Sequence, residues 1–338
     1  MRSYHANLGA GLEGLTLKDG PEPKVRPEEV LVRVRAASLN YRELMIMIGG
    51  RYPLPVKPDV IVASDGAGEI VAVGEAVTRA RVGDRIVASM FPRWMDGPFT
   101  LEHAAQLGGS LDGMMTELKA LREDAIVPIP EHLSFEEAAT LPCAAVTAWN
   151  ALTGGRPLRA GESVLTLGSG GVSLFALQFA KMFGSYVIAT TSTEEKAAKL
   201  KALGVDHVID YRASPDWPAE VREATGGRGV DHVVEVGGPA TLEQSLRATA
   251  VGGEIAWVGS LAQGAPPVDV TALFNAAASL RSIAAGSRAQ LVAVTRAIAV
   301  HRARPILDRV FAFEEVPAAF SYYVAGRAFG KVVIRVCP

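Results

Sequence analysis

The chain has 338 residues, of which 49% are hydrophobic and 21% charged, a globular balance with enough length for two domains. The formal net charge of -2 gives no electrostatic reason to expect nucleic acid or an anionic membrane as a partner. Two cysteines, Cys143 and Cys337, exclude a disulfide framework and a four-cysteine zinc lobe. Because the first residues also lack the apolar core of a signal peptide, we expect a soluble cytoplasmic protein.

The first third of the chain has the pattern of a β-rich domain. Residues 29–36 alternate apolar and charged side chains, as a half-buried strand does. Further short strands, each bounded by Gly, Pro or Asp, are predicted at 60–62, 69–74 and 82–88. Strands of this length and spacing predict a compact, barrel-like domain.

A long loop follows, from Phe91 to Gly113. Loops of this length usually carry function or are disordered. The aromatic side chains of Trp94 and Phe99, with His103, suggest that the loop covers an apolar substrate, although an ordinary packed loop would have the same composition.

The periodicity changes after this loop. Ser134 and Glu137 form a capping box that opens a helix through the following Ala-rich stretch. Strands are then predicted at 164–167, 186–190, 207–209, 230–236 and 254–258, with helices at 172–183 and 194–203 between them, and a last strand at 330–336. This alternation predicts a parallel sheet with helices on both faces. The uncharged stretch 163–180 contains glycines and hydroxyls, which favours a strand, turn and helix over a membrane span.

The strongest local motif lies between the first of these strands and its helix. It reads Gly168, Ser169, Gly170, Gly171 and Val172, with Ser173 where the usual fingerprint has a third glycine. Glycines at such a turn let the backbone approach a diphosphate, and the helix N-terminus offers free N–H groups to that anion. The motif therefore predicts a dinucleotide site, although a glycine turn can also be purely structural.

The end of the next strand decides which dinucleotide is expected. NAD-type sites place an acid there to bind the ribose 2′-hydroxyl, but this chain has hydroxyl residues, among them Thr190 and Ser192. Lys196 is one helical turn further on and could supply the cation for a 2′-phosphate, while Tyr211 follows the next strand and could reach the adenosine end. We expect NADP(H), with NAD(H) as the alternative if Lys196 is only a solvated helix residue.

Several segments together resemble a known family. They are EEVLVRVRAASLNYREL, SDGAGEIVAVGEAV, VGDRIVA, LPCAAVTAW, KALGVDHVIDY and FGKVVI, besides the glycine turn. Over essentially its whole length the chain resembles the medium-chain dehydrogenase/reductase superfamily, in particular its zinc-independent quinone oxidoreductase-like branch. The resemblance implies an α/β protein with a GroES-like β-barrel catalytic domain from residues 1–128 and 290–338, and a doubly wound Rossmann domain from 129–289. It also implies a homodimer joined through the Rossmann sheets.

The same resemblance bears on zinc. The positions that hold catalytic zinc in related alcohol dehydrogenases are Asn40, Ser64 and Cys143 here, with Asp65 at a nearby acidic position. A catalytic zinc needs about three protein ligands of Cys, His or carboxylate type. The six histidines show no paired spacing and are interpreted as surface or loop residues. We therefore expect no metal site, and Cys143 as a small packed residue beside the nicotinamide.

Without a metal, another group must stabilise charge on the substrate oxygen. The resemblance implies Asn40 and Tyr52 as catalytic residues: Asn40 as an amide donor to substrate or nicotinamide ribose, and Tyr52 as a hydroxyl or proton donor. The alternatives are that Asn40 caps a turn, that Tyr52 only packs, and that solvent supplies the proton.

Further cofactor contacts are expected at the carboxyl ends of the parallel strands. These ends are Val236 with Gly237, and Val258 with Gly259 and Ser260. The resemblance adds Thr147, at a position near the nicotinamide, and Lys331, which would reach the cofactor from the last segment.

Three hypotheses for function follow. The first is an NADP(H)-dependent reductase of small apolar quinones, enones or other activated carbonyls. The second is a zinc-free alcohol dehydrogenase or aldehyde reductase. The third is a nucleotide-binding structural or sensor protein without turnover. The sequence leaves the substrate, the direction and the stereochemistry open.

Overall fold

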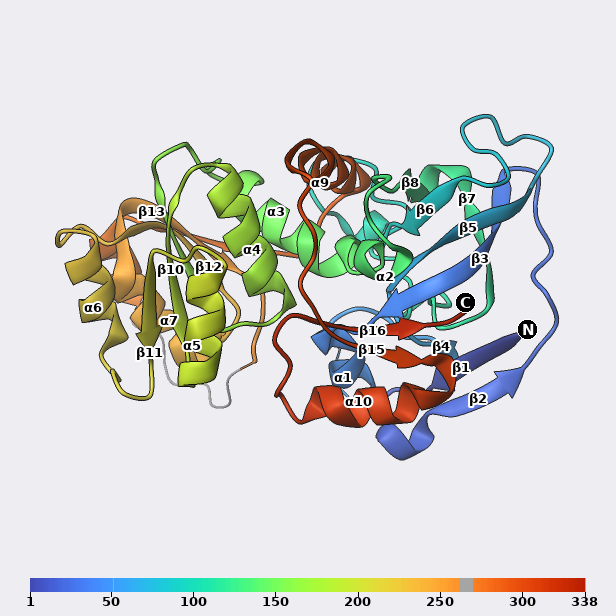
Figure 1. Ribbon diagram of the computed structural model, residues 1–338, viewed down its shortest axis with the longest axis horizontal. Coiled ribbons are helices and arrows are strands. Elements are labelled where there is room, and N and C mark those ends of the chain that lie inside the picture. The colour runs from blue at the N-terminus through green and yellow to red at the C-terminus, as the bar shows by residue number, and fades with distance from the viewer. Residues whose placement is uncertain (51, 262–269, 338) are drawn as a thin grey trace. The chain divides into compact units, whose positions relative to one another are not determined.

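A computed structural model describes residues 1–50, 52–261 and 270–337 of the chain. The chain divides into two compact units, shown in Figure 1. The first contains Met1–Val146 and Gly286–Pro338, and the second contains Thr147–Ala285. Each is described by itself below.

The first unit is built on mostly antiparallel β-structure, with one parallel pair among its described strands, β15 (Leu307–Ala312) and β16 (Lys331–Arg335). Its seven-stranded sheet, all within the described residues, runs β15, β16, β3 (Glu29–Ser38), β5 (Asp65–Val73), β6 (Arg85–Ala88), β8 (Ile126–Pro128), with β7 (Leu118–Arg122) also paired to β3. A second sheet runs β2 (Thr16–Asp19), β1 (Arg2–Ala6), β4 (Val60–Ile61). Both chain ends thus contribute strands, as expected for a GroES-like domain, although the sequence analysis did not predict β1 and β2.

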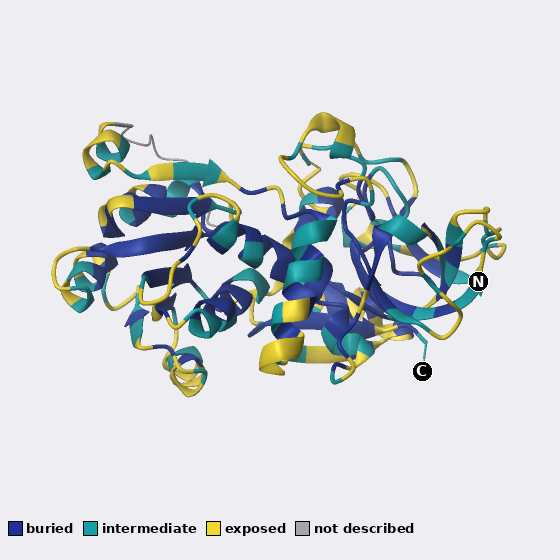
Figure 2. Cartoon of the chain, turned by 90° about the horizontal axis from the view of Figure 1, so that it is seen from above, coloured by how far each residue is buried: buried dark blue, intermediate teal, exposed yellow. Residues whose placement is uncertain are grey.

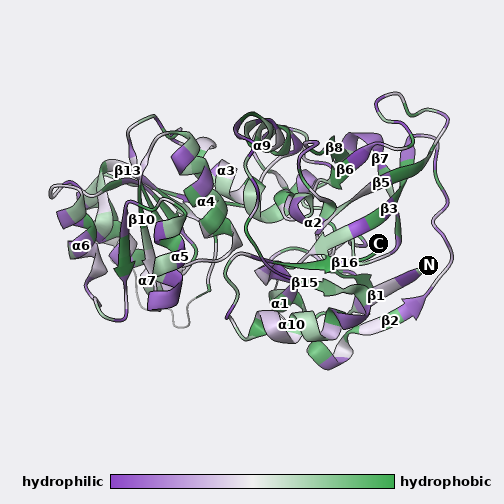
Figure 3. Cartoon of the chain, in the orientation of Figure 1, coloured by the Kyte–Doolittle hydropathy of each residue, from purple (hydrophilic) through white to green (hydrophobic). Residues whose placement is uncertain are grey.

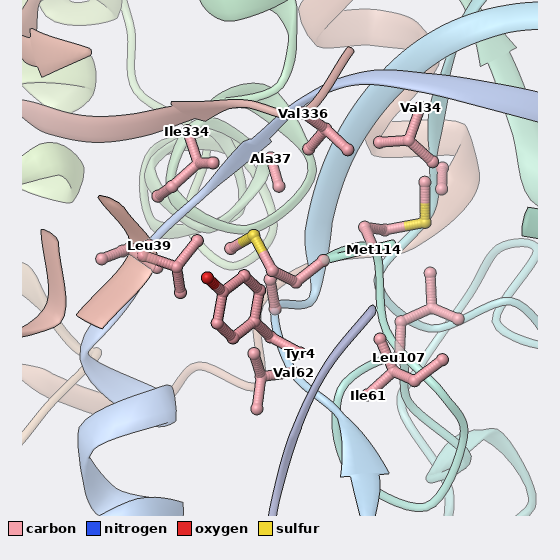
Figure 4. Packing of buried hydrophobic residues seen from close by; sticks show 14 of the residues in the cluster. Tyr4, Val34, Ala37, Leu39, Ile61, Val62, Leu107, Met114, Ile334 and Val336 are labelled. Atoms are coloured by element: carbon pink, nitrogen blue, oxygen red, sulfur yellow. The ribbon is translucent and has the colours of Figure 1, made fainter. Parts of the chain in front are cut away.

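Side chains from both sheets form the core of this unit. In β3 the inward positions Val30, Val32 and Val34 are fully buried, which agrees with the alternation seen in the sequence. Figure 4 shows the Tyr4 ring among Leu39 and other buried side chains of this cluster. The ring of Tyr4 also meets that of Phe313 edge-on, with centroids 5.1 Å apart.

Four helices complete the first unit among the described residues: α1 (Tyr41–Met47), α2 (Phe135–Ala138), α9 (Arg288–His301) and α10 (Val316–Val324). The predicted capping box is present, with the Glu137 N–H donating to Ser134 Oγ at 3.2 Å. The helix it opens is shorter than predicted. After Ala138 the chain turns into a π-helical segment, Leu141–Ala145, which has Pro142 in its first turn, and then into α3 (Val146–Thr153).

The first boundary between the two units lies later in the chain than predicted, after Val146 rather than after residue 128. The sequence analysis assigned residues 129–146 to the Rossmann domain, whereas the structure places them in the first unit. The physical reason is that α2 packs on β3, β5 and β16. The second boundary, before Gly286, lies within a few residues of the predicted one at 290.

The second unit is a parallel sheet with helices packed on it (Figures 1 and 2). Its described strands run β11 (His207–Asp210), β10 (Tyr186–Thr191), β9 (Ser163–Leu167), β12 (Val230–Glu235), β13 (Thr249–Trp257), β14 (Ser279–Ser282). Its helices, apart from α3, are α4 (Gly171–Met182), α5 (Glu194–Ala202), α6 (Trp217–Ala224), α7 (Pro239–Ala248) and α8 (Val270–Ala276). The order reverses between β9 and β12, which is the Rossmann arrangement, so the predicted α/β fold class is confirmed.

The hydropathy pattern follows these layers. Figure 2 shows the strands mostly buried, and Figure 3 shows hydrophilic residues along helices such as α5 and α6. All five residues of β9 are buried, as expected for a strand covered on both faces. Within the described ranges, none of the helices combines the length and apolar character that crossing a membrane requires.

His232 corrects one expectation. The sequence analysis interpreted all histidines as surface or loop residues, but His232 lies in β12 and is only 1% exposed. Its Nε2 lies 2.7 Å from Arg156 Nη1, and Nδ1 has no hydrogen-bond partner in the part of the chain that the structure describes. Since the guanidinium can only donate, Nε2 accepts and the ring is neutral.

A pH dependence of stability follows from this burial. Burial and the Arg156 charge hold the pKa of His232 below its ordinary value of 6.5. The unfolded chain therefore binds this proton more readily, and the free energy of unfolding falls as pH drops below about 6.5. A His232→Gln variant is expected to show a flatter fall between about pH 7 and pH 5 in urea unfolding. The exposed His301→Gln serves as the control, and equal slopes for His232→Gln and wild type would contradict the expectation.

Candidate functional site

The glycine turn between β9 and α4 is held open toward solvent. Gly168 has φ 74, a backbone conformation that favours glycine, and its N–H donates to Thr190 O at 3.0 Å and to Thr190 Oγ1 at 3.3 Å. Thr190 is 3% exposed, so its hydroxyl supports the turn from β10. The predicted residues Gly168 and Thr190 are thus brought together.

The N-terminus of α4 has the features of an anion site. Gly170 is the N-cap, and no side chain of the described residues caps the free amides of the first turn. A Cβ added at Gly168 or Gly170 would meet no atom within 4 Å, so the backbone here is open to a ligand. Ser173, which replaces the third glycine, is 2% exposed and donates from Oγ to Leu167 O at 2.7 Å. Helix α4 therefore keeps its close contact with β9, and the residues present fit a bound diphosphate.

Two cations without partners stand at the ends of β10 and β11. Thr193 caps α5 by accepting from the Lys196 N–H, while the Lys196 side chain makes no hydrogen bond or ion pair with any described residue. The Arg212 guanidinium, next to the exposed Tyr211, is equally free among the residues described. Because Thr191 and Asp210 are register partners, these strand ends are adjacent. Arg212 was missed by the sequence analysis, although it directly follows Tyr211.

The buried carboxylate of Glu235 organises the turn between β12 and α7. Glu235 is fully buried and accepts from the N–H groups of Gly237 at 2.7 Å and Gly238 at 2.9 Å, from Thr241 Oγ1 at 2.7 Å, and from Ser245 Oγ. A Cβ at the predicted residue Gly259 would lie 2.9 Å from Val236 O, which explains the glycine there. Val236 and Gly237 are buried, Val258, Gly259 and Ser192 are half-buried, and Ser260 is exposed. Glu235 gave no signal in the sequence beyond its place at a strand end.

In the first unit, Asn40 is the centre of a buried polar cluster. It is 6% exposed, and its Nδ2 donates to Asp65 Oδ2 at 2.9 Å and weakly to Ser64 Oγ at 3.5 Å. Its Oδ1 accepts from Lys331 Nζ at 2.5 Å. Lys331 also donates to Leu39 O at 2.7 Å and lies 3.7 Å from Asp65 Oδ2. Lys331 was predicted to reach the cofactor, whereas the structure directs its ammonium group to Asn40 and Asp65.

Burial and the neighbouring charges shift the pKa values of the acidic groups in this cluster. Burial raises the pKa of Asp65 to about 6, while Lys331 and Asn40 keep it from rising further. Burial and the nearby Asp65 charge raise the pKa of the Cys143 thiol above its ordinary range. Cys143 is therefore a protonated thiol rather than a thiolate, in agreement with a packing role.

Glu43 joins this cluster to helix α1. It is 2% exposed; its Oε2 accepts from the Asn40 N–H at 2.7 Å, which makes Asn40 the N-cap of α1. Its Oε1 accepts from the Ser64 N–H and from Arg42 Nη1, each at 3.1 Å. The expectation that Asn40 caps a turn and the expectation that it belongs to a site are thus both compatible with its contacts.

Arg42 connects the cluster to Tyr52. Its Nε donates to the Tyr52 hydroxyl oxygen at 3.1 Å, and its Cζ lies 5.0 Å from the centroid of the Tyr52 ring. Arg42 is 6% exposed, whereas Tyr52 is half-buried. The sequence analysis did not single out Arg42, and its position in the segment NYREL offered no signal beyond its charge.

The loop after Phe91 is packed. Phe91 and Trp94 are buried, and the rings of Phe91, Trp94 and Phe99 form edge-on contacts with centroids 5.0–6.1 Å apart. His103 stacks on Trp94 at 6.2 Å. These aromatic groups contact one another, so their presence agrees with an ordinary packed loop.

Comparison with known proteins identifies the family. The family model described as zinc-binding dehydrogenase matches residues 171–299, and that described as alcohol dehydrogenase GroES-like domain matches residues 26–131. A zinc-type alcohol dehydrogenase-like protein of Schizosaccharomyces pombe is 41% identical over 320 residues, covering 93% of this chain and 92% of the relative. The chain belongs to the medium-chain dehydrogenase/reductase superfamily.

Within this superfamily, the relatives agree with the quinone oxidoreductase-like branch. A quinone oxidoreductase of Pseudomonas aeruginosa is 34% identical over 251 residues, covering 74% of this chain and 70% of the relative. A crystal structure from Sinorhizobium meliloti, assigned to the alcohol dehydrogenases, matches with TM-score 0.91 and 38% identity over 99% of both chains. A crystal structure of an NAD-dependent alcohol dehydrogenase matches with TM-score 0.90 and 33% identity over 100% of both. This medium-chain dehydrogenase/reductase is an oxidoreductase of a family that uses nicotinamide dinucleotides.

Proposed function

We propose that the chain is a zinc-independent, NADP(H)-dependent reductase of small activated carbonyl compounds, such as enones and quinones. The observation that carries this proposal is the buried cluster of Asn40, Asp65 and Lys331, because Asn40 stands at one of the positions that hold zinc in related enzymes and both ends of its amide are hydrogen-bonded, to Asp65 and to Lys331.

These residues do not suit zinc. The Oδ1 and Nδ2 of Asn40 are already engaged by Lys331 and Asp65, and an amide is in any case a poor zinc ligand. Lys331 supplies a positive charge next to Asp65, and Cys143 would have to lose a proton whose pKa is raised. Among the described residues, no three His, Cys, Asp or Glu side chains are grouped so that they could hold a metal.

The residues for NADP(H) lie in the second unit. The diphosphate would be held by the backbone amides of the glycine turn and the first turn of α4, at Gly168, Ser169, Gly170, Gly171 and Val172. The 2′-phosphate would be surrounded by Lys196, Arg212 and Tyr211. Val236, Gly237, Val258, Gly259 and Ser260 are assigned to the nicotinamide half, with the buried Thr147 at the start of this unit. The bound dinucleotide supplies the hydride; the chain supplies orientation and charge.

Tyr52 is assigned the role of hydrogen-bond donor to the substrate oxygen. Both ends of the Asn40 amide are hydrogen-bonded inside the cluster. Asn40 and Lys331 are therefore assigned a structural role: Lys331 holds the Leu39 carbonyl and balances the charge of Asp65. Tyr52 accepts from Arg42, which leaves the hydroxyl hydrogen of Tyr52 free to donate. A donor aimed at a developing oxyanion is the group that a metal-free reductase needs.

A second candidate function is a zinc-free alcohol dehydrogenase. It is favoured by the similarity to proteins described as alcohol dehydrogenases, one of them NAD-dependent. The NADP(H) cofactor of the first function is preferred because the acid expected for an NAD site is absent from the end of β10, while Lys196 on α5 and Arg212 after β11 have no partners among the described residues.

One assay tests the proposal. NADPH oxidation is measured against quinones, enones and aldehydes, and NADP⁺ or NAD⁺ reduction against alcohols, with metal analysis of the same sample. We expect turnover of NADPH with quinones or enones, no stoichiometric zinc, and no loss of activity with a chelator. Turnover only with alcohols selects the second function, and no turnover with any compound leaves a nucleotide-binding protein without activity.

Lys196→Glu tests the dinucleotide preference. Reversing this charge is expected to weaken NADPH binding about tenfold to hundredfold, with little change for NADH, because only NADPH carries the 2′-phosphate. Lys199→Glu is the matched control, since Lys199 lies on the same helix but pairs with Glu195 at 2.7 Å. Titration calorimetry measures all four affinities, and equal losses for the two nucleotides would remove Lys196 from the phosphate site.

We also propose that the protein forms a homodimer through the edge of the Rossmann sheet. Among the described strands β14 is at the edge of this sheet, and Phe274 on α8, the helix that precedes β14 in the chain, is 82% exposed. An unpaired edge beside an exposed aromatic residue is a suitable association surface. Light scattering of the purified chain gives the molar mass that decides this.

A further inference from the structure

Arg42 is a buried cation with an incomplete set of acceptors. It is 6% exposed; its Nη1 donates to Glu43 Oε1 and Leu107 O, each at 3.1 Å, and its Nε donates to Tyr52. Its Nη2 is buried and has no hydrogen-bond partner in the described part of the chain. Burying a guanidinium is costly unless it is fully paired, so packing alone does not account for an arginine at this position.

Of the three described residues that Arg42 contacts through hydrogen bonds, Tyr52 is accessible to solvent. Tyr52 is half-buried, while Arg42 lies behind it, held by Glu43 and the Leu107 carbonyl. The Nη2 atom is covered by protein, so a substrate cannot approach Arg42 directly. The one route from the buried charge toward a ligand therefore passes through the hydroxyl oxygen of Tyr52, which Nε contacts at 3.1 Å.

We propose that Arg42 is a positioning residue that aims the Tyr52 hydroxyl at the substrate oxygen and stabilises the charge left on Tyr52 when it gives up its proton. This role rests on the proposed reductase function. The Glu43 carboxylate and the Leu107 carbonyl fix the guanidinium plane, and the contact with the Tyr52 ring fixes the phenol above it.

The proton transfer balances as follows. A bound dinucleotide would supply a hydride, with its electron pair, to the substrate carbon, and the electron pair of the reduced double bond would move to the substrate oxygen. That oxygen forms a bond to the Tyr52 proton, the Tyr52 O–H bond breaks, and its electron pair stays on the phenolate oxygen beside Arg42 Nε. Because Tyr52 is half-buried, solvent can return a proton to it after product leaves.

A double-mutant cycle tests this coupling. Arg42→Met, Tyr52→Phe and the double variant are assayed with NADPH and trans-2-hexenal, or the best acceptor of the panel above. Each single variant is expected to lower kcat about 10²-fold with a much smaller change in KM, since general acid catalysis contributes about 10²- to 10⁴-fold. If Arg42 acts through Tyr52, the double variant is no slower than Tyr52→Phe. Arg42→Lys keeps the charge and is expected to recover part of the loss.

Arg85→Met is the matched control. Arg85 also donates to backbone carbonyl oxygens of the first unit, Glu131 O and Leu133 O, and its Cζ lies 4.6 Å from the Phe135 ring. It is expected to leave kcat unchanged. Two results would overturn the role given to Arg42 while leaving the reductase function intact. One is that the kcat losses of Arg42→Met and Tyr52→Phe multiply in the double variant, and the other is that Arg42→Met raises KM without lowering kcat. A wild-type enzyme inactive with every acceptor overturns the proposed function and this role with it.

Discussion

A Gly170→Asp variant is expected to fold as well as the wild type and to lose dinucleotide binding. Gly170 is the N-cap of α4, with φ -76 and ψ 174, an extended conformation that any residue adopts. A Cβ there meets no atom within 4 Å, so the protein itself offers no steric objection. An aspartate would cap the free amides of α4, and the stability of the unit should change by no more than about 0.5 kcal/mol relative to glycine.

The same carboxylate would occupy the place of the diphosphate. It would accept the amide hydrogen bonds that the ligand needs and add a negative charge within about 4 Å of the phosphates. At that distance the repulsion near a protein surface is on the order of 4 kcal/mol, so affinity for NADPH and NADH alike should fall by about 10²- to 10³-fold. Gly170→Ala adds only the Cβ and should give a smaller loss.

Gly20→Asp is the control for this experiment. Gly20 lies in the first unit, its added Cβ also meets no atom within 4 Å, and its φ lies outside the left-handed region. This variant should bind NADPH as the wild type does. Thermal unfolding monitors the fold and calorimetry the affinity. Unchanged affinity in Gly170→Asp would mean that the diphosphate does not lie at α4, and the assignment of this turn would be wrong.

The parts of the fold that local sequence determines were predictable. The strand β9, the glycine turn and α4 follow from a continuous apolar run, three glycines and an amphipathic segment, and the structure has them within one or two residues. The capping box at Ser134 was correct for the same reason, because its partners are three residues apart. The helix after it was too long in the prediction, since the effect of Pro142 was not considered.

The candidate site was less predictable because its contacts are distant in sequence. Lys331 meets Asn40 across 291 positions, and Arg42 meets Leu107 across 65. No periodicity in the chain marks such pairs. His232 illustrates the same limit, because the apolar pattern of β12 predicted a buried strand without revealing that Arg156 would donate to His232 Nε2. The family resemblance indicated Asn40 and Tyr52, and only the geometry shows which groups hold them.

Lys331→Met should be the most destabilising of these substitutions. Lys331 is 3% exposed and neutralises the fully buried Asp65 carboxylate while donating to Leu39 O and Asn40 Oδ1. Methionine fills a similar volume but leaves Asp65 without this cation. Removing one partner of a buried pair costs about 3–5 kcal/mol, and urea unfolding of the first unit at pH 8 should show a loss of this order. Adding Asp65→Asn should recover much of it, because no buried charge then remains unpaired.

The pH dependence distinguishes this charge effect from a packing defect. In the wild type the pKa of Asp65 is about 6, above the ordinary 3.8, so the folded chain binds this proton more tightly and stability falls as pH rises between these values. Without Lys331 the pKa rises further and the fall continues to higher pH. The gap in unfolding free energy between Lys331→Met and wild type should therefore be widest near pH 8 and narrow toward pH 5. Lys18→Met is the control, since Lys18 pairs at 2.7 Å with Asp59, a carboxylate that is about half exposed and stays solvated without it. A gap that does not vary with pH would show that Lys331 contributes through packing rather than by neutralising Asp65.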